Sequence, residues 1–240
     1  MPGPTPTSIK SIADHVRAHH ARAVERLERL VNHDTPSTDV NANREAIAMI
    51  SAWCEAHGAT VEVVDAGNAH ADHLIARWPA RAADGDKILI LNHVDTVWPA
   101  DETQRRPFHR DGDRATGPGI FDMKSGIVQS VEAIDAARSV DPLERTSITL
   151  IVTSDEEVGS PTSRSLIERE ALKSALVLVA EPSSDGALKT ARKSVGMYEI
   201  TAEGRAAHAG LEPEAGRSAI LDMSRQIPII DALNDSAVGT

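Results

Sequence analysis

Six residues in four short segments of this sequence are of the types that bind divalent metal ions or move protons. They are His93 and Asp95, Asp122, Glu156 and Glu157, and Glu181. Three of the segments come after an apolar run, and the fourth is a loop punctuated by glycine. Imidazole and carboxylate donors without a thiolate suit zinc, or ions of similar hardness such as cobalt and manganese. Together they predict a metal centre, although each segment alone has a more ordinary interpretation.

The first segment follows the apolar run Ile88–Leu91. Residues two apart in an extended chain project to the same side, so His93 can bind a metal while Asp95 accepts a hydrogen bond from its other ring nitrogen. Taken alone, this pair is more typical of an ordinary surface or core histidine than of a metal ligand.

The second segment is the glycine-rich loop 117–126, which leads into a predicted helix. Glycine lets the backbone pass close to a ligand, and Asp122 stands just ahead of the helix, where it could bind a metal or merely cap the helix. A phosphate-binding loop is excluded because neither of the usual glycine signatures is present.

The third and fourth segments supply the remaining carboxylates. Adjacent residues in extended backbone point to opposite sides, so one of Glu156 and Glu157 can bind a metal while the other faces a water beside the substrate. An acidic run of this kind is otherwise most often a solvated loop. Glu181 is followed by Pro182, which fixes its extended conformation and prevents ladder pairing.

Hydrophobic periodicity predicts strands that alternate with helices, which is typical of an α/β fold with a mostly parallel sheet covered by helices. In such a sheet, ligands gather at the carboxyl ends of the strands, where the four segments lie. Helices are expected over Ala21–Val31, Asn43–Glu55, Lys124–Ala137 and Ser163–Leu172, and strands over Thr60–Val64, His73–Trp78, Lys87–Asn92, Ser147–Val152 and a buried run Leu176–Val179.

A turn-rich stretch, Pro182–Gly186, predicts a domain boundary, with residues 1–185 before it and 186–240 after it. Beyond it, Ser194–Ala202 alternates like an antiparallel edge strand, and Ser218–Leu233 has a helical pattern that Pro228 is expected to interrupt.

Composition limits the function classes. The chain has 240 residues, a formal net charge of −11 and 41% hydrophobic content, which excludes collagen-like and wholly disordered proteins. The acidic balance argues against nucleic acid, and the longest apolar run, Ala175–Ala180, is far too short to span a membrane. The N-terminus lacks a secretory pattern, so we expect a cytoplasmic protein. The single cysteine, Cys54, is interpreted as a core residue, and no G-x-S-x-G elbow supports a serine nucleophile.

Five motifs, taken in order, resemble the carboxypeptidase G branch of the co-catalytic zinc metallopeptidases, a superfamily that includes aminoacylase, acetylornithine deacetylase and succinyl-diaminopimelate desuccinylase. The motifs are His93-x-Asp95-Thr96-Val97, Gly117-Pro118-Gly119-x-x-Asp122-Met123-Lys124-x-Gly126, Asp155-Glu156-Glu157-x-Gly159-Ser160, Ala180-Glu181-Pro182-Ser183 and Gly204-x-Ala206-x-His208-Ala209-Gly210.

The resemblance implies a role for each residue. Asp122 would bridge two divalent metal ions, most simply zinc, with His93 and Glu181 completing the first site and Glu157 binding the second. Glu156 would be the general base that takes a proton from a metal-bridging water. The resemblance also implies a cis peptide bond between Asp122 and Met123.

The resemblance makes residues 186–240 the beginning of a lid and dimerisation domain. There His208 would reach the partner subunit's active site of a homodimer and stabilise the oxyanion, unless it is an ordinary loop histidine. Relatives of this type continue well beyond the position of Thr240 and supply a last metal-ligand histidine and an arginine for the substrate carboxylate. We therefore expect the 240-residue chain alone to be a poor enzyme.

The resulting hypothesis is a metal-dependent amidohydrolase that cleaves an amide bond to a C-terminal amino acid such as glutamate, in an N-acyl amino acid or short peptide. Its rival is a catalytically incompetent fragment of such an enzyme, which binds metal or dimerises at most. A third alternative is an α/β binding domain for another ligand, which the density of ligand-type residues disfavours.

Overall fold

The computed structural model describes residues 6–82, 85–140, 143–191 and 196–237. The chain divides into two compact units, Met1–Leu188 and Lys189–Thr240. The turn-rich stretch in the sequence places the boundary three residues earlier, after Asp185.

The first unit is built on a five-stranded sheet with the order β1-β2-β6-β3-β7. Strand β3 pairs in parallel with both β6 and β7, whereas β1–β2 and β2–β6 are antiparallel. The predicted α/β class is confirmed, but the sheet is mixed rather than mostly parallel. The short connection between β1 and β2 explains the difference, because a parallel pair needs a crossover of a dozen residues or more. The strands are β1 (Thr60–Val64), β2 (His73–Trp78), β3 (Asp86–His93), β6 (Thr146–Thr153) and β7 (Leu176–Val179).

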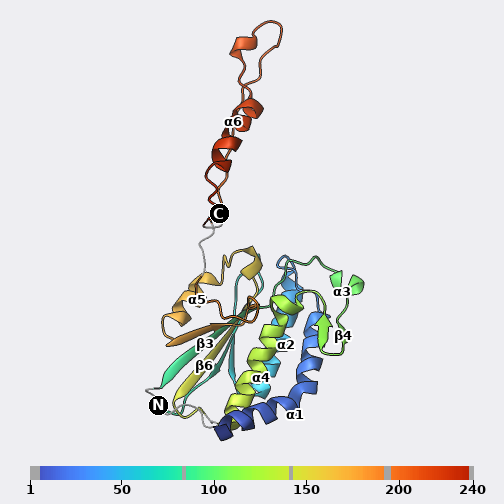
Figure 1. Cartoon of the computed structure of the whole chain (residues 1–240), viewed down its shortest axis with the longest axis vertical. Coiled ribbons are helices and arrows are strands. Elements are labelled where there is room, and N and C mark those ends of the chain that lie inside the picture. The colour runs from blue at the N-terminus through green and yellow to red at the C-terminus, as the bar shows by residue number, and fades with distance from the viewer. Residues whose placement is uncertain (1–5, 83–84, 141–142, 192–195, 238–240) are drawn as a thin grey trace. The chain divides into compact units, whose positions relative to one another are not determined.

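Helices cover both faces of this sheet (Figure 1). Successive residues of β2 show the two layers: Leu74 packs with α1, α2 and α4 on one face, and Ile75 packs with Leu166 of α5 on the other. The buried Cys54 of α2 belongs to the larger core cluster, as predicted. No described helix is long and apolar enough to cross a membrane. The helices of this unit are α1 (Pro6–Val31), α2 (Val40–Ala56), α3 (Glu102–Arg105), α4 (Ser125–Val140) and α5 (Arg164–Ala171).

Short elements occupy the connections between these helices and strands. A separate hairpin joins β4 to β5, and a tight turn, η1, leads directly into α4. Another turn, η2, follows β6. Their bounds are β4 (His109–Asp111), β5 (Arg114–Thr116), η1 (Ile120–Lys124) and η2 (Glu156–Val158).

Strand β7 is an edge strand, and the expectation that Leu176–Val179 is buried is wrong. Its four apolar side chains are 40–49% exposed. Among the described residues β7 pairs only with β3, so its other edge and parts of both faces stay open.

The second unit contains the turn η3 (Pro213–Ala215), the helix α6 (Ala219–Asp231) and an isolated bridge between Arg205 and Arg217. The predicted edge strand is wrong for residues 196–202, which form no strand, since a strand needs a neighbour to pair with. Residues 194–195 lie outside the described residues. Helix α6 runs through Pro228 instead of being interrupted there, and Ser218 caps its start.

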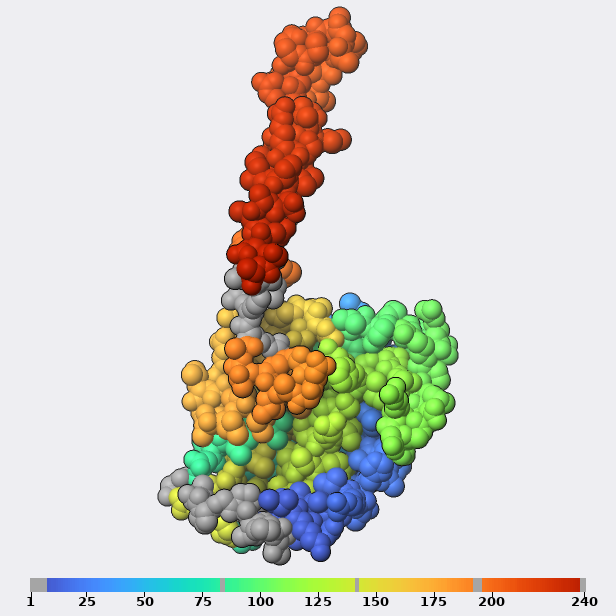
Figure 2. Space-filling view, in the orientation of Figure 1, coloured from blue at the N-terminus to red at the C-terminus, as the bar shows by residue number. Residues whose placement is uncertain are grey.

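A group of charged side chains joins α1 to α4, whose surfaces adjoin in Figure 2. Arg22 donates to Glu132 at 2.5 Å and to Asp135 at 2.7 Å. His15 and His57 also contact Asp135, at 3.0 Å and 2.9 Å. Burial alone would raise the pKa of Asp135, but the Arg22 and His15 hydrogen bonds and the charge of His57 outweigh it and lower this pKa to about 2.

We predict that Asp135→Asn lowers the free energy of unfolding by about 2 kcal/mol at neutral pH. A carboxylate whose pKa is lower in the folded state stabilises that state at any pH above the pKa of the unfolded state. The difference should vanish as the pH falls from about 4 to about 2, where both states bind the proton. Urea unfolding followed by circular dichroism measures it. Asp14→Asn is the control, since Asp14 forms an exposed pair with Arg17 and should change little. An equal loss in both variants would contradict the prediction.

Candidate metal centre

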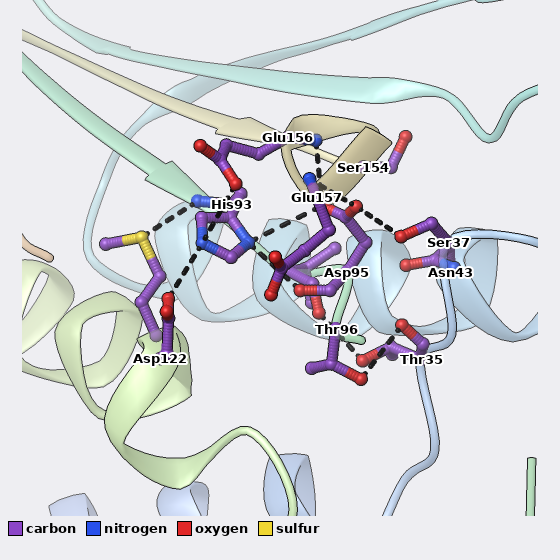
Figure 3. Close-up of polar contacts among 12 residues, drawn as sticks. Thr35, Ser37, Asn43, His93, Asp95, Thr96, Asp122, Ser154, Glu156 and Glu157 are labelled. Carbon is purple, nitrogen blue, oxygen red and sulfur yellow. Dashed lines mark hydrogen bonds and ion pairs between the residues drawn. The ribbon is translucent and has the colours of Figure 1, made fainter. Parts of the chain in front are cut away.

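Parallel pairing brings the metal-type residues together. The register aligns His93 of β3 with Thr153 of β6 and Leu91 of β3 with Val179 of β7, so all three strands end at the same edge of the sheet. Glu156 and Glu157 follow β6 in η2, and Glu181 follows β7. Asp122 reaches the same place from η1 (Figure 3).

His93 is the centre of this cluster. Its side chain is 2% exposed, and Nε2 lies 3.1 Å from Asp122 Oδ1, 3.5 Å from Glu181 Oε1 and 3.9 Å from Glu156 Oε2. These distances match the expectation that His93 approaches Asp122 and Glu181 closely. The carboxylates of Asp122 and Glu156 are about half exposed, so the cluster is open to solvent on their side.

Asp95 connects three chain segments, and its carboxylate is completely buried. Oδ1 accepts from the backbone N–H of Glu156 at 3.2 Å, and Oδ2 accepts from the N–H of Glu157 at 3.2 Å. The hydroxyl of Ser37 donates to Oδ2 at 2.7 Å. The predicted bond from His93 differs in detail: its Nδ1 lies 3.0 Å from the backbone carbonyl of Asp95 and 3.5 Å from the carboxylate.

Two groups of three residues each could hold a metal ion. Every residue of a group offers one donor atom, and the three donor atoms lie within 4.8 Å of one another. His93, Glu156 and Glu181 form one group, and His93, Asp122 and Glu157 form the other. Either group could hold a divalent ion, and imidazole with carboxylates fits zinc, cobalt or manganese. Asp122 and Glu181 fall in different groups, and Glu156, expected as a base, is also within reach of an ion.

The turn η1 presents Asp122 in extended backbone, between a left-handed Gly119 and the start of α4. The carboxylate faces His93, with Oδ1 3.1 Å from Nε2. A Cβ at Gly119 would lie 2.4 Å from the Thr96 side chain, which is why this loop needs glycine there. The predicted cis peptide bond between Asp122 and Met123 is confirmed.

The negative charges of the cluster affect one another. Burial alone would lower the pKa of His93, but the Asp95 and Glu181 carboxylates outweigh it and raise this pKa to about 11. The pKa values of Glu156 and Glu157 are raised, and burial is the largest cause. The charge of His93 lowers both pKa values, but the neighbouring carboxylates raise them again. A site with this excess of negative charge attracts a cation.

Sequence reasoning missed the loop after α1 as part of the site. Thr35 donates to the carbonyl of Val94 at 2.7 Å, beside the Ser37 contact with Asp95. The buried ammonium of Lys124 donates to the carbonyl of His33 at 2.7 Å and ties this loop to η1. Residues 33–37 follow the predicted helix Ala21–Val31, and the hydroxyl groups of Thr35 and Ser37 were the available signal.

His208 lies in the second unit, in an exposed turn, where its Nδ1 accepts from the N–H of Gly210 at 3.2 Å. The role that the resemblance implies for it stays a prediction.

The sequence of residues 89–233 matches the peptidase family M20/M25/M40. The chain belongs to this family. Membership confirms the resemblance and implies metal-dependent hydrolysis of amide bonds as the family chemistry, with divalent ions as cofactors.

Curated relatives agree with this assignment. Carboxypeptidase G2 of Pseudomonas sp. (strain RS-16) is 31% identical over 204 residues, which cover 84% of this chain and 49% of that protein. The N-acetyl-L-citrulline deacetylase of Xanthomonas campestris is 29% identical over 83% of this chain and 51% of that protein. The chain therefore spans about half the length of these relatives.

The fold of this chain is also similar to that of a solved peptidase structure. The aminopeptidase PepT from Bacillus cereus superposes with a TM-score of 0.62 at 22% identity, covering 87% of this chain and 56% of that one. At this identity the similarity supports the shared fold alone.

We predict that His93→Ala weakens zinc binding by more than about 100-fold, because His93 belongs to both donor groups and loss of even an outer partner of a metal ligand costs about 10–100-fold. Titration calorimetry with the 240-residue chain measures the affinity. His109→Ala is the matched control, since His109 lies on the exposed strand β4. Unchanged zinc affinity in His93→Ala would remove the metal centre from this cluster.

Proposed function

We propose that this chain forms the metal-binding part of an amidohydrolase that cleaves an amide bond to a C-terminal amino acid such as glutamate. The observation that carries the proposal is the buried His93, whose ring nitrogen faces the carboxylates of Asp122 and Glu181 within 3.5 Å at the edge of the sheet. The curated relative named for carboxypeptidase activity supports an amino acid as leaving group.

The residues would hold two divalent ions, which we propose to be zinc. His93 and Glu181 would bind one ion, Glu157 the other, and Asp122 would bridge both. A shared carboxylate is favourable there because it offsets the repulsion between two cations. Bound ions of this kind polarise the amide carbonyl and supply a water of lowered pKa.

Glu156 is proposed as the general base. Its carboxylate lies 3.9 Å from His93 Nε2 and is 44% exposed, so it borders the ion site and is open to the solvent from which a substrate would come. It would accept the proton of the attacking water and later transfer it to the leaving amine. Its raised pKa brings the carboxylate nearer to the range in which it can both take and return a proton.

The remaining assignments are proposals for the whole protein. His208 would stabilise the oxyanion in the active site of a partner subunit, which makes a homodimer the functional form. The substrate would be an N-acyl amino acid or a short peptide. The alternative, a fragment that binds metal without turnover, is favoured by one observation: the chain covers only 49% of its carboxypeptidase relative.

Glu156→Gln tests the division of roles between the paired glutamates. In the full-length protein, loss of the base should remove most turnover, by about 10²–10⁴-fold, while the bound zinc is retained. Glu157→Gln should instead lose zinc. Release of glutamate from an N-acyl glutamate and the zinc content after dialysis are the two measurements. Zinc loss in Glu156→Gln with retention in Glu157→Gln would show that the roles are reversed.

A further inference from the structure

A row of polar groups, buried except for the half-buried Thr162, lies beside η2 and takes no part in the donor groups. It begins on β2 at His73, which is 1% exposed. The ring contacts the backbone N–H of Ser154 through Nδ1 at 3.3 Å and the hydroxyl of Thr162 through Nε2 at 3.0 Å. The Thr162 hydroxyl donates to Asp155 Oδ2 at 2.7 Å.

Donor and acceptor chemistry fixes the direction of this row. A backbone N–H can only donate, so Nδ1 of His73 must be the acceptor and carry no proton. The proton is then on Nε2, which donates to Thr162, and the Thr162 hydroxyl is free to donate onward to Asp155. Burial lowers the pKa of His73, which agrees with a neutral ring.

Asp155 closes the turn that carries the two glutamates. Its side chain is completely buried, and Oδ2 also accepts from the backbone N–H groups of Thr162 at 2.8 Å and Ser163 at 3.1 Å. Its carbonyl accepts from the N–H of Ser160 at 2.8 Å. The chain before Glu156 and the chain after Glu157 are therefore held on the same residue.

We propose that His73 and Thr162 are positioning residues that act through Asp155 to hold the backbone of Glu156 and Glu157 against the metal centre. The inference rests on the proposed function, because it assigns these residues a role in that same site. Asp95, just after β3, holds the N–H groups of the glutamates, and the row from His73 holds the same turn from β2 and from the residues just before α5.

The turn needs a second anchor for an electrostatic reason. Asp122 Oδ1 and Glu156 Oε2 lie 3.1 Å and 3.9 Å from the same nitrogen of His93, so like charges are crowded on the open side of this turn and repel each other. Without a bound cation this repulsion pushes the exposed side chains apart. A buried anchor on the far side of the turn resists that movement and keeps the donor atoms in place before an ion arrives.

Thr162→Val is the decisive variant, because it removes the hydroxyl link and keeps the side-chain shape and the backbone N–H. We expect cobalt affinity to fall about tenfold and the visible spectrum of the bound cobalt to change, as for other residues that orient metal ligands. Thr162→Ser restores the hydroxyl and should restore both the affinity and the spectrum. Affinity and spectrum unchanged in Thr162→Val would overturn the proposal.

Two measurements need no metal and separate this inference from the proposed function. Nitrogen NMR of the 240-residue chain should show His73 as the neutral ring with its proton on Nε2. Hydrogen exchange at the Glu156 and Glu157 amides should be faster in Thr162→Val than in Thr162→Ser. If the unmodified chain binds no cobalt, the proposed function fails, and the exchange rates still decide whether the row holds the turn. A proton on Nδ1 of His73, or equal exchange rates in Thr162→Val and Thr162→Ser, would overturn the inference that His73 and Thr162 position the turn.

Discussion

The buried carboxylate of Asp95 is the interaction on which the candidate site depends. It lies just after β3, and it accepts hydrogen bonds from both glutamate amides of η2 and from Ser37 in the loop after α1. An unpaired buried carboxylate would be costly, so these donors are also what makes its burial tolerable. One side chain thus stabilises the fold at the sheet edge and sets the spacing between His93 and the carboxylates around it.

Much of the site was predictable because its signals are local. A histidine at the end of an apolar run, a glycine-rich loop before a helix and paired glutamates after a strand are each visible within about ten residues. Parallel pairing of β3 with β6 and β7 then follows from the alternation of strands and helices, and it brings the three strand ends to one edge.

The supporting contacts were not predictable in the same way. Lys124 reaches His33 across 91 positions, and Ser37 reaches Asp95 across 58, so the sequence reveals the residue types but not which groups will meet. The sequence predicted His73 only as the first residue of a strand. An alternating pattern does not distinguish a buried imidazole with two hydrogen-bond partners from an ordinary polar position. The mixed sheet was missed for a related reason: strand patterns carry no direction, and only the short connection before β2 indicated a hairpin.

The open edge of β7 has a consequence for how the protein behaves in solution. Four consecutive apolar residues in extended conformation have no strand partner along one side among the residues that the structure describes, which leaves a template for adding another strand. Nothing in Leu176–Val179 opposes this, because the run contains neither a charge nor a proline. Strand addition at this edge would extend the sheet from one molecule to the next, so the association of the chain would depend on its concentration, and a peptide of matching alternation would compete for the same edge.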